Sequence, residues 1–273
     1  MNEEHPPALR ATPLASEGGF MHLFKRGFSF AVDGPGNRLV YHLRGCNFRC
    51  PWCANPECFL PFEGPGTPIE EILKEAEQAR PLYIAGGGVT FTGGEPTCQF
   101  GALKEALEGL KERNIHTCVE SNASHPGLPA LFPLIDLLIL DCKHYDDALH
   151  RRWTGQGNEQ VLANIRALSK NDKNLSRNDK TGGPNLSRND KKILVRIPLV
   201  GGVNAAPEDA AAFAALFKTL GEFPVEVLRY HEFGKPKWEQ QGMEYTMRGA
   251  GVSDAQAREF QSKLEQRPSD VRM

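Results

Sequence analysis

The chain has 273 residues and a formal net charge of −2, with 40% hydrophobic and 24% charged residues. This length fits one large α/β domain or two small ones, and the charge balance gives no reason to expect a nucleic-acid or anionic-membrane partner. No run of about 18 apolar residues occurs, so no membrane-spanning helix is expected. The first residues lack the basic and apolar segments of a secretory signal. Seven cysteines, an odd number, argue against a disulfide framework, so we expect a protein of the reducing cytoplasm.

The beginning of the chain changes character near residue 20. Residues 1–19 are rich in Pro, Ala and Glu without periodicity, which predicts a flexible leader. The glycines and proline of Asp33–Gly36 predict a tight turn. The apolar run Leu39–Leu43 predicts a buried strand that leads the chain directly to Cys46.

Beyond residue 60, apolar patterns of strand and helix length alternate. Such alternation predicts βαβ units and a parallel sheet, and ligands of these sheets lie at the carboxyl ends of the strands. With Leu39–Leu43 included, the chain has six expected strands. The other strands are expected over Val89–Thr92, Ile115–Asn122, Leu134–Leu140, Ile193–Leu199 and Val225–Tyr230, and the helices over Pro68–Ala79, Phe100–Arg113, Asn158–Leu168 and Pro207–Leu220.

The segment 169–192 has a different composition. It contains Asn-Leu-Ser-Arg-Asn-Asp-Lys twice, at 174–180 and 185–191, and it is too polar to bury a core. Its basic residues raise the alternative of a nucleic-acid patch, but interspersed aspartates offset much of that charge. We therefore expect a polar, mobile insertion between a helix and a strand, within a single domain that spans 20–273.

Three cysteines are packed into eight residues, as Cys46-x₃-Cys50-x₂-Cys53. Thiolates select zinc, Cu(I) or iron–sulfur clusters. A closed zinc site takes four protein ligands, so three cysteines predict a metal centre with one position open for chemistry. The alternative is a structural zinc knuckle that a distant His or Cys completes. Cys98, Cys118 and Cys142 lack metal spacing and are expected to be packing residues. Cys58, which follows the motif, is expected to be a bystander, with a ligand role as the alternative.

A glycine-rich run, Gly93-Gly94-Glu95-Pro96, follows the strand expected at Val89–Thr92. It lacks the Gly-Lys-Ser/Thr of a phosphate-binding loop, but its glycines allow the backbone to approach a ligand closely. Further polar residues fall at or near the ends of the later strands, which predicts one shared site. They are Glu120, Asn122, Asp141, Lys143, Arg196 and His231.

The cysteine motif, with Trp52 just before its third cysteine, resembles the signature of radical S-adenosylmethionine (SAM) enzymes, and Gly93–Pro96 resembles their Gly-Gly-Glu-Pro motif. Two further runs, Asp33-Gly-Pro-Gly-Asn-Arg38 and Asn55-Pro-Glu57, resemble segments of the glycyl radical enzyme activating enzymes, a subfamily of that group. Only one extra cysteine appears before residue 67, so the ferredoxin-like insertion of many such enzymes is not expected.

The resemblance implies a partial (β/α)₆ TIM-like barrel with one [4Fe–4S] cluster on Cys46, Cys50 and Cys53. It implies that SAM binds at the open iron and that a monovalent cation binds near Glu120 and Asp141, although Glu120 departs from the usual Asp. The residues that it assigns to SAM are Gly93, Gly94, Glu95, Asn122, Asp141, Lys143 and His231, with Arg196 and Trp52 as further candidates, and Lys143 and His231 also as catalytic residues.

The resemblance also implies an anaerobic, cytoplasmic reaction. Flavodoxin or ferredoxin would reduce the cluster, reductive cleavage of SAM would give a 5′-deoxyadenosyl radical, and that radical would remove a hydrogen from a glycine Cα of a partner glycyl radical enzyme. Pyruvate formate-lyase is the default partner. Two alternatives stay open: a radical SAM enzyme with a small-molecule substrate, similar to 7-carboxy-7-deazaguanine synthase, and a zinc or iron–sulfur binding module without enzymatic activity.

Overall fold

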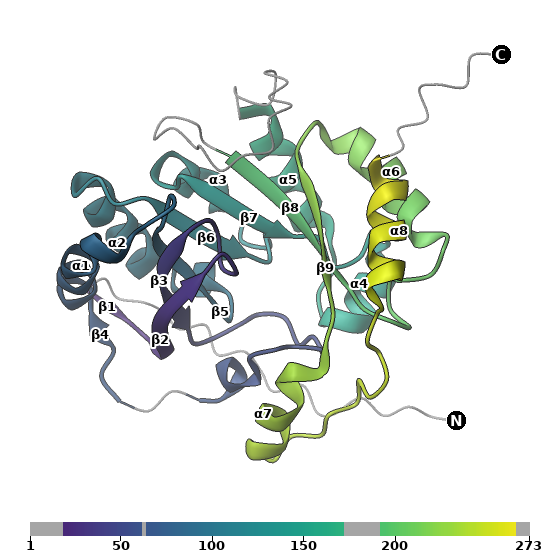
Figure 1. Ribbon diagram of the computed structural model, residues 1–273, viewed down its shortest axis with the longest axis horizontal. Helices are drawn as coiled ribbons and strands as arrows, with labels where there is room; N and C mark the ends of the chain where they lie inside the picture. Colours follow the sequence, from purple (N-terminus) through teal and green to yellow (C-terminus); the bar gives the residue numbers. More distant parts are fainter. Residues whose placement is uncertain (1–18, 62–63, 172–191, 266–273) are drawn as a thin grey trace.

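The computed structural model describes residues 19–61, 64–171 and 192–265 (Figure 1). The expected leader, apart from Gly19, and the centre of the expected insertion lie outside the described residues. The helix before the expected insertion continues to Asn171, and the next strand begins at Lys192. The Ser169 hydroxyl lies 3.0 and 2.9 Å from the carbonyl oxygens of Arg166 and Leu220, and its single proton is shared between these two acceptors.

A seven-stranded sheet forms the centre of the described fold, in the order β2-β3-β5-β6-β7-β8-β9. From β3 to β9 the neighbouring strands are parallel and follow chain order, which confirms the six predicted strands and the α/β fold class. The bounds are β2 Leu23–Phe30, β3 Asn37–Leu43, β5 Gly88–Gly93, β6 Thr117–Ser121, β7 Leu137–Asp141, β8 Lys192–Leu199 and β9 Val225–Arg229.

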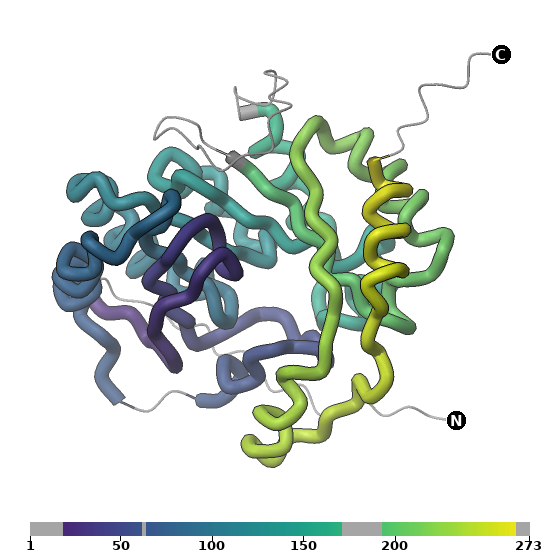
Figure 2. Tube along the Cα trace, viewed as in Figure 1, coloured from purple at the N-terminus to yellow at the C-terminus, as the bar shows by residue number. Residues whose placement is uncertain are grey.

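The sequence patterns did not predict β2, which pairs antiparallel with β3 through the predicted turn. They also missed a small two-stranded sheet of β1 (Phe20–Met21) and β4 (Thr67–Pro68). In the described residues β2 and β9 are the two edges of the large sheet and do not pair with each other. The sheet therefore curls into an open, partial barrel, which Figure 2 shows as a chain that winds from the purple hairpin to the light-green strand β9.

Helices cover the outer side of the curled sheet (Figure 1). The four predicted helices are present, and three more that were not predicted lie at α4, α7 and α8, besides the single turn α3. None of the described helices is long and apolar enough to cross a bilayer. Their bounds are α1 Ile69–Gln78, α2 Phe100–Glu112, α3 Leu128–Leu131, α4 Asp147–Thr154, α5 Glu159–Asn171, α6 Asp209–Leu220, α7 Lys235–Gln240 and α8 Asp254–Glu265.

Side chains alternate between two faces along each strand, so the sheet separates an apolar layer from a polar interior. On the outer face, the rings of Tyr41 and Phe91 stack with centroids 5.7 Å apart, and the Tyr41 hydroxyl donates to Glu75 of α1 at 2.9 Å. The inner face carries polar residues instead, such as Thr92 and Glu120, whose side chains hydrogen-bond at 2.8 Å. The carboxyl ends of the strands thus meet around a polar interior.

The opposite end of the strands is held by Arg38, which is fully buried. Its guanidinium donates to the Thr90 hydroxyl and to the Val89 carbonyl, both at 2.6 Å, and to the Pro35 carbonyl at 3.2 Å. The Thr90 hydroxyl in turn donates to the Asp33 carbonyl at 2.7 Å. Burial lowers the pKa of Arg38, and these acceptors compensate for its lost hydration. The Asp33–Arg38 turn is thereby fixed to β5.

We predict that Arg38→Met lowers the free energy of unfolding by about 3 kcal/mol, because several buried acceptors lose their donor at once. The matched control is Arg26→Met. Arg26 is 44% exposed and forms ion pairs with Glu71 and Glu75 at 3.1 Å, which are worth less than about 1 kcal/mol. Urea unfolding monitored by circular dichroism measures both variants. Equal losses in the two variants would contradict the structural role given to Arg38.

Candidate active site

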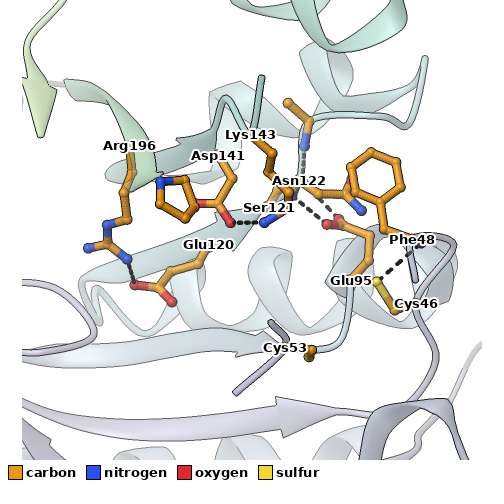
Figure 3. A network of polar contacts seen from close by, with 12 residues as sticks. Cys46, Phe48, Cys53, Glu95, Glu120, Ser121, Asn122, Asp141, Lys143 and Arg196 are labelled. Atoms are coloured by element: carbon orange, nitrogen blue, oxygen red, sulfur yellow. Dashed lines mark hydrogen bonds and ion pairs between the residues drawn. The ribbon is translucent and has the colours of Figure 1, made fainter. Parts of the chain in front are cut away.

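A cavity of about 240 Å³ lies at the carboxyl ends of the parallel strands. It is roofed by the segment Gly45–Asn55, which we call the cysteine loop. The cavity brings together every site residue that the sequence predicted, with the exception of Glu95 (Figure 3 shows most of them). These residues are Cys46, Cys50, Trp52, Cys53, Gly93, Gly94, Glu120, Asn122, Asp141, Lys143, Arg196 and His231.

The three thiols of the cysteine loop line this cavity together. Backbone N–H groups of Phe48 and Asn55 donate to the sulfurs of Cys46 and Cys53, each at 3.4 Å. Burial raises the pKa of the Cys46 thiol and raises that of Cys50 to about 12, whereas a hydrogen bond from the Cys58 thiol lowers the pKa of Cys53. No three His, Cys, Asp or Glu side chains of the described residues converge closely enough to hold a single metal ion.

Gly93 and Gly94 place the end of β5 directly against the cysteine loop. The N–H of Gly94 donates to the Leu43 carbonyl at 2.9 Å, and the N–H of Glu95 donates to the Gly45 carbonyl at 2.8 Å. A Cβ on Gly94 would lie 2.1 Å from the Gly45 oxygen, and Gly93 has a φ of +112°. The glycines therefore allow the predicted close approach of the backbone. Gly94 packs against the backbone of the cysteine loop and also lines the cavity.

The Glu95 carboxylate does not line the cavity, although the resemblance assigned it to SAM. It is 1% exposed and accepts four hydrogen bonds: from the N–H and hydroxyl of Thr97 at 3.0 and 2.6 Å, the hydroxyl of Ser121 at 2.8 Å and the N–H of Asn122 at 2.6 Å. Burial raises the pKa of Glu95, and these hydrogen bonds act in the opposite direction. Glu95 thus ties the ends of β5 and β6 together (Figure 3).

Asn122 extends this connection to the cysteine loop. Its side-chain NH₂ donates to Asn47 Oδ1 at 2.9 Å, and Asn47 Nδ2 donates to the Ser124 hydroxyl at 2.7 Å. The Ser124 hydroxyl donates back to Asn122 Oδ1 at 2.7 Å. The sequence analysis missed Asn47 and Ser124. Asn47 could have been noticed as the polar residue directly after Cys46. Its partner Asn122 lies 75 positions away, so no local pattern indicated their contact.

Charged side chains in the cavity are already paired. Lys143 contacts Asp141 at 2.7 Å, and Arg196 contacts Glu120 at 3.0 Å and Glu226 at 2.7 Å. Burial acts against the charge of Lys143, but Asp141 together with Cys50 and Cys46 outweighs burial, and the pKa of Lys143 is raised. The two carboxylates that were predicted to border a monovalent cation, Glu120 and Asp141, thus each contact a cationic side chain (Figure 3).

The last strand and the segment after it close the other side of the cavity. His231 follows β9, lines the cavity and remains exposed, with its ring 3.8 Å from the Phe233 ring. In α7, the Trp238 indole N–H donates to the Cys53 carbonyl at 2.9 Å and Lys237 Nζ donates to Asn55 Oδ1 at 2.7 Å. Neither residue was predicted as part of the site.

Comparison with known proteins agrees with this arrangement. Residues 40–210 match the Radical SAM superfamily. The chain belongs to the radical SAM superfamily. It is 30% identical to the pyruvate formate-lyase 1-activating enzyme of Escherichia coli K12, over 80% of this chain and 84% of that one. It is also 30% identical to the pyruvate formate-lyase-activating enzyme of Staphylococcus epidermidis, over 83% of this chain and 87% of that one. This radical SAM protein therefore belongs to the family of the pyruvate formate-lyase-activating enzymes.

Solved structures show the same fold. A radical SAM methyltransferase from Sphaerobacter thermophilus aligns with 87% of this chain and 65% of its own, with a TM-score of 0.58 at 14% identity. The predicted partial barrel of the radical SAM type is thus confirmed. As a radical SAM protein of the pyruvate formate-lyase-activating family, it is an enzyme of the glycyl-radical-activating type that uses a [4Fe–4S] cluster and SAM.

The donor set fits such a cluster. Three sulfurs line one cavity, and backbone N–H groups donate to two of them, as is usual for cluster ligands because hydrogen bonds to sulfur set the reduction potential. Trp52, which is 6% exposed and has its ring centroid 6.2 Å from that of Trp153, packs beside the thiols and limits the access of water. The cysteine loop therefore offers three sulfur ligands to one cavity, of which Cys50 is buried and Cys46 and Cys53 are partly exposed.

We predict that Gly94→Ala reduces the iron content after anaerobic reconstitution well below that of the wild type. The added Cβ would meet the Gly45 carbonyl oxygen, which is backbone, so the cysteine loop must shift. The control is Gly251→Ala, because no atom lies within 4 Å of a Cβ built there. Iron and sulfide assays per chain make the comparison. A Gly94→Ala variant that binds as much iron as the control would show that the close approach is not needed.

Proposed function

We propose that this enzyme activates a glycyl radical enzyme of the pyruvate formate-lyase type, by removing a hydrogen atom from one glycine Cα with a 5′-deoxyadenosyl radical made from SAM. The two curated relatives are named for pyruvate formate-lyase, and the chain spans most of their length. The observation that carries the proposal is that one cavity contains the three cysteines, the Lys143–Asp141 pair and the exposed His231. We further propose an anaerobic cytoplasmic setting with flavodoxin or ferredoxin as electron donor.

The residues of the cavity divide into two groups in this proposal. Cys46, Cys50 and Cys53 hold the [4Fe–4S] cluster, which supplies the electron that cleaves SAM when it is bound. Lys143, held charged by Asp141, attracts the carboxylate of SAM. The other residues position SAM through backbone and side-chain polar groups or cover it: Gly93, Gly94, Asn122, Arg196, His231 and Trp52.

Two structural features support productive geometry in this site. The network of Glu95, Asn122 and Asn47 fixes the cysteine loop against the strand ends through protein groups alone. Such preorganisation is needed because a radical must form within reach of its target and away from water. The exposed side of the cavity, at His231, is where a peptide segment of a partner can approach.

The proposal is tested with anaerobically reconstituted enzyme, dithionite and SAM, mixed with purified pyruvate formate-lyase. We expect an EPR doublet of a glycyl radical on the partner and 5′-deoxyadenosine in the solution. Cys53→Ala should abolish both, whereas Cys98→Ala, which removes a thiol outside the cavity lining, should leave both in place. SAM cleavage without a glycyl signal would overturn the proposed partner class and favour a small-molecule substrate. A chain that binds zinc and never cleaves SAM would overturn the enzymatic assignment.

We predict that Lys143→Gln weakens SAM binding by about tenfold or more, because a hydrogen bond to a charged group is worth about 1.5–3 kcal/mol. Lys104→Gln is the control, since Lys104 forms an exposed ion pair with Glu108 on α2. Titration of the reconstituted enzymes with SAM, followed by the change in the EPR spectrum of the reduced cluster, yields the dissociation constants. Unchanged affinity in Lys143→Gln would remove Lys143 from the proposed SAM site.

A further inference from the structure

A fourth thiol, that of Cys58, lies in the same cavity as the three cysteines of the motif. It is 1% exposed, and it forms a hydrogen bond with the sulfur of Cys53. The sequence predicts that Cys58 is a bystander, with a ligand role as the alternative. The remaining cysteines of the described chain, Cys98, Cys118 and Cys142, do not line the cavity.

The backbone of Cys58 is fixed to both ends of the cysteine loop. Cys58 lies in the 3₁₀ turn Pro56–Phe59, and its N–H donates to the Asn55 carbonyl at 3.1 Å. Its carbonyl accepts from the N–H of Gly45 at 3.0 Å, one residue before Cys46. On a third side, a Cβ on Gly94 would lie only 3.1 Å from Cys58 Cβ. These contacts fix the backbone of Cys58 beside the cysteine loop, with its Cβ next to the close approach of Gly94.

We propose that Cys58 is a positioning residue for the cluster: its S–H donates to the sulfur of Cys53 and makes the [4Fe–4S] cluster easier to reduce. A reduced cluster carries one more negative charge than the oxidised one, and part of that charge resides on the ligand sulfurs. A donor that points at a ligand sulfur therefore stabilises the reduced state more than the oxidised state. The inference rests on the proposed role of Cys53 as a ligand.

The test compares Cys58→Val, which is of similar size and has no donor, with Cys58→Ser, which keeps one. Both are measured as reconstituted holoenzymes without SAM, in an EPR-monitored redox titration. We expect the ratio of reduced to oxidised cluster at a fixed potential to fall about threefold in Cys58→Val, as for the loss of a weak S–H donor. A threefold fall in this ratio corresponds to a reduction potential that is lower by about 28 mV for a one-electron couple. The reduction potential of the Cys58→Ser variant should be closer to that of the wild type, because the serine hydroxyl is still a donor.

The control is Cys118→Val, because Cys118 is also fully buried but lies outside the cavity. Its potential should equal that of the wild type. If Cys58→Val misfolds, the smaller Cys58→Ala repeats the measurement without added volume. Potentials of the Val or Ala variant equal to that of the wild type, at full iron content, would overturn the proposal.

A second outcome would also overturn it. If Cys58→Val and Cys58→Ser both lose iron while Cys53→Ala retains it, Cys58 is itself a ligand in place of Cys53. None of these measurements includes a partner enzyme, so they stand whether or not a glycyl radical forms. The failure of the proposed function and the failure of this inference are therefore distinguishable.

Discussion

The buried carboxylate of Glu95 holds together the segments that form the cavity. The carboxylate accepts hydrogen bonds from Ser121 and Asn122 at the end of β6 and from Thr97 in the turn after β5. The backbone N–H of Glu95 donates to the Gly45 carbonyl in the cysteine loop. A carboxylate suits this place because it only accepts hydrogen bonds, and every neighbouring group is a donor. A glutamine would direct its NH₂ at one of those donors. Four hydrogen bonds to a charged acceptor are strong, and they therefore compensate for the free energy lost when the Glu95 carboxylate is removed from water.

Other buried charges inside the barrel are also compensated by polar partners. Arg196 reaches from β8 to Glu120 on β6 and to Glu226 on β9, and Lys143 pairs with Asp141. Because the carboxylates outweigh the effect of burial, the pKa of Arg196 is raised and it stays charged. Each of these charges has an opposite charge within reach, so protein groups alone compensate the charges of the polar interior. A site of this kind needs little reorganisation when it binds charged groups.

The sequence predicted the strands and the cavity better than it predicted the contacts between them. The parallel strands were found because each is a short apolar run, and the cavity followed because parallel strands end at one edge. The edge strand β2 was not predicted because it contains no continuous apolar run. Its Phe28 and Phe30 alternate with glycine and a polar residue, and both rings are exposed. The inward turn of Glu95 was equally hidden, since its partners, Ser121 and Asn122, lie 26 and 27 residues away.

The cysteine loop also depends on the end of the fold, which no local pattern revealed. Trp238 donates to the Cys53 carbonyl across 185 residues, and Lys237 reaches Asn55 and Glu57. The loop is thus fixed from β5 and β6 on one side and from α7 on the other. In an unfolded chain three cysteines within eight residues have no such supports. Because the supports come from both halves of the sheet, the shape of the loop depends on the fold as a whole, and we expect cluster binding to be coupled to folding.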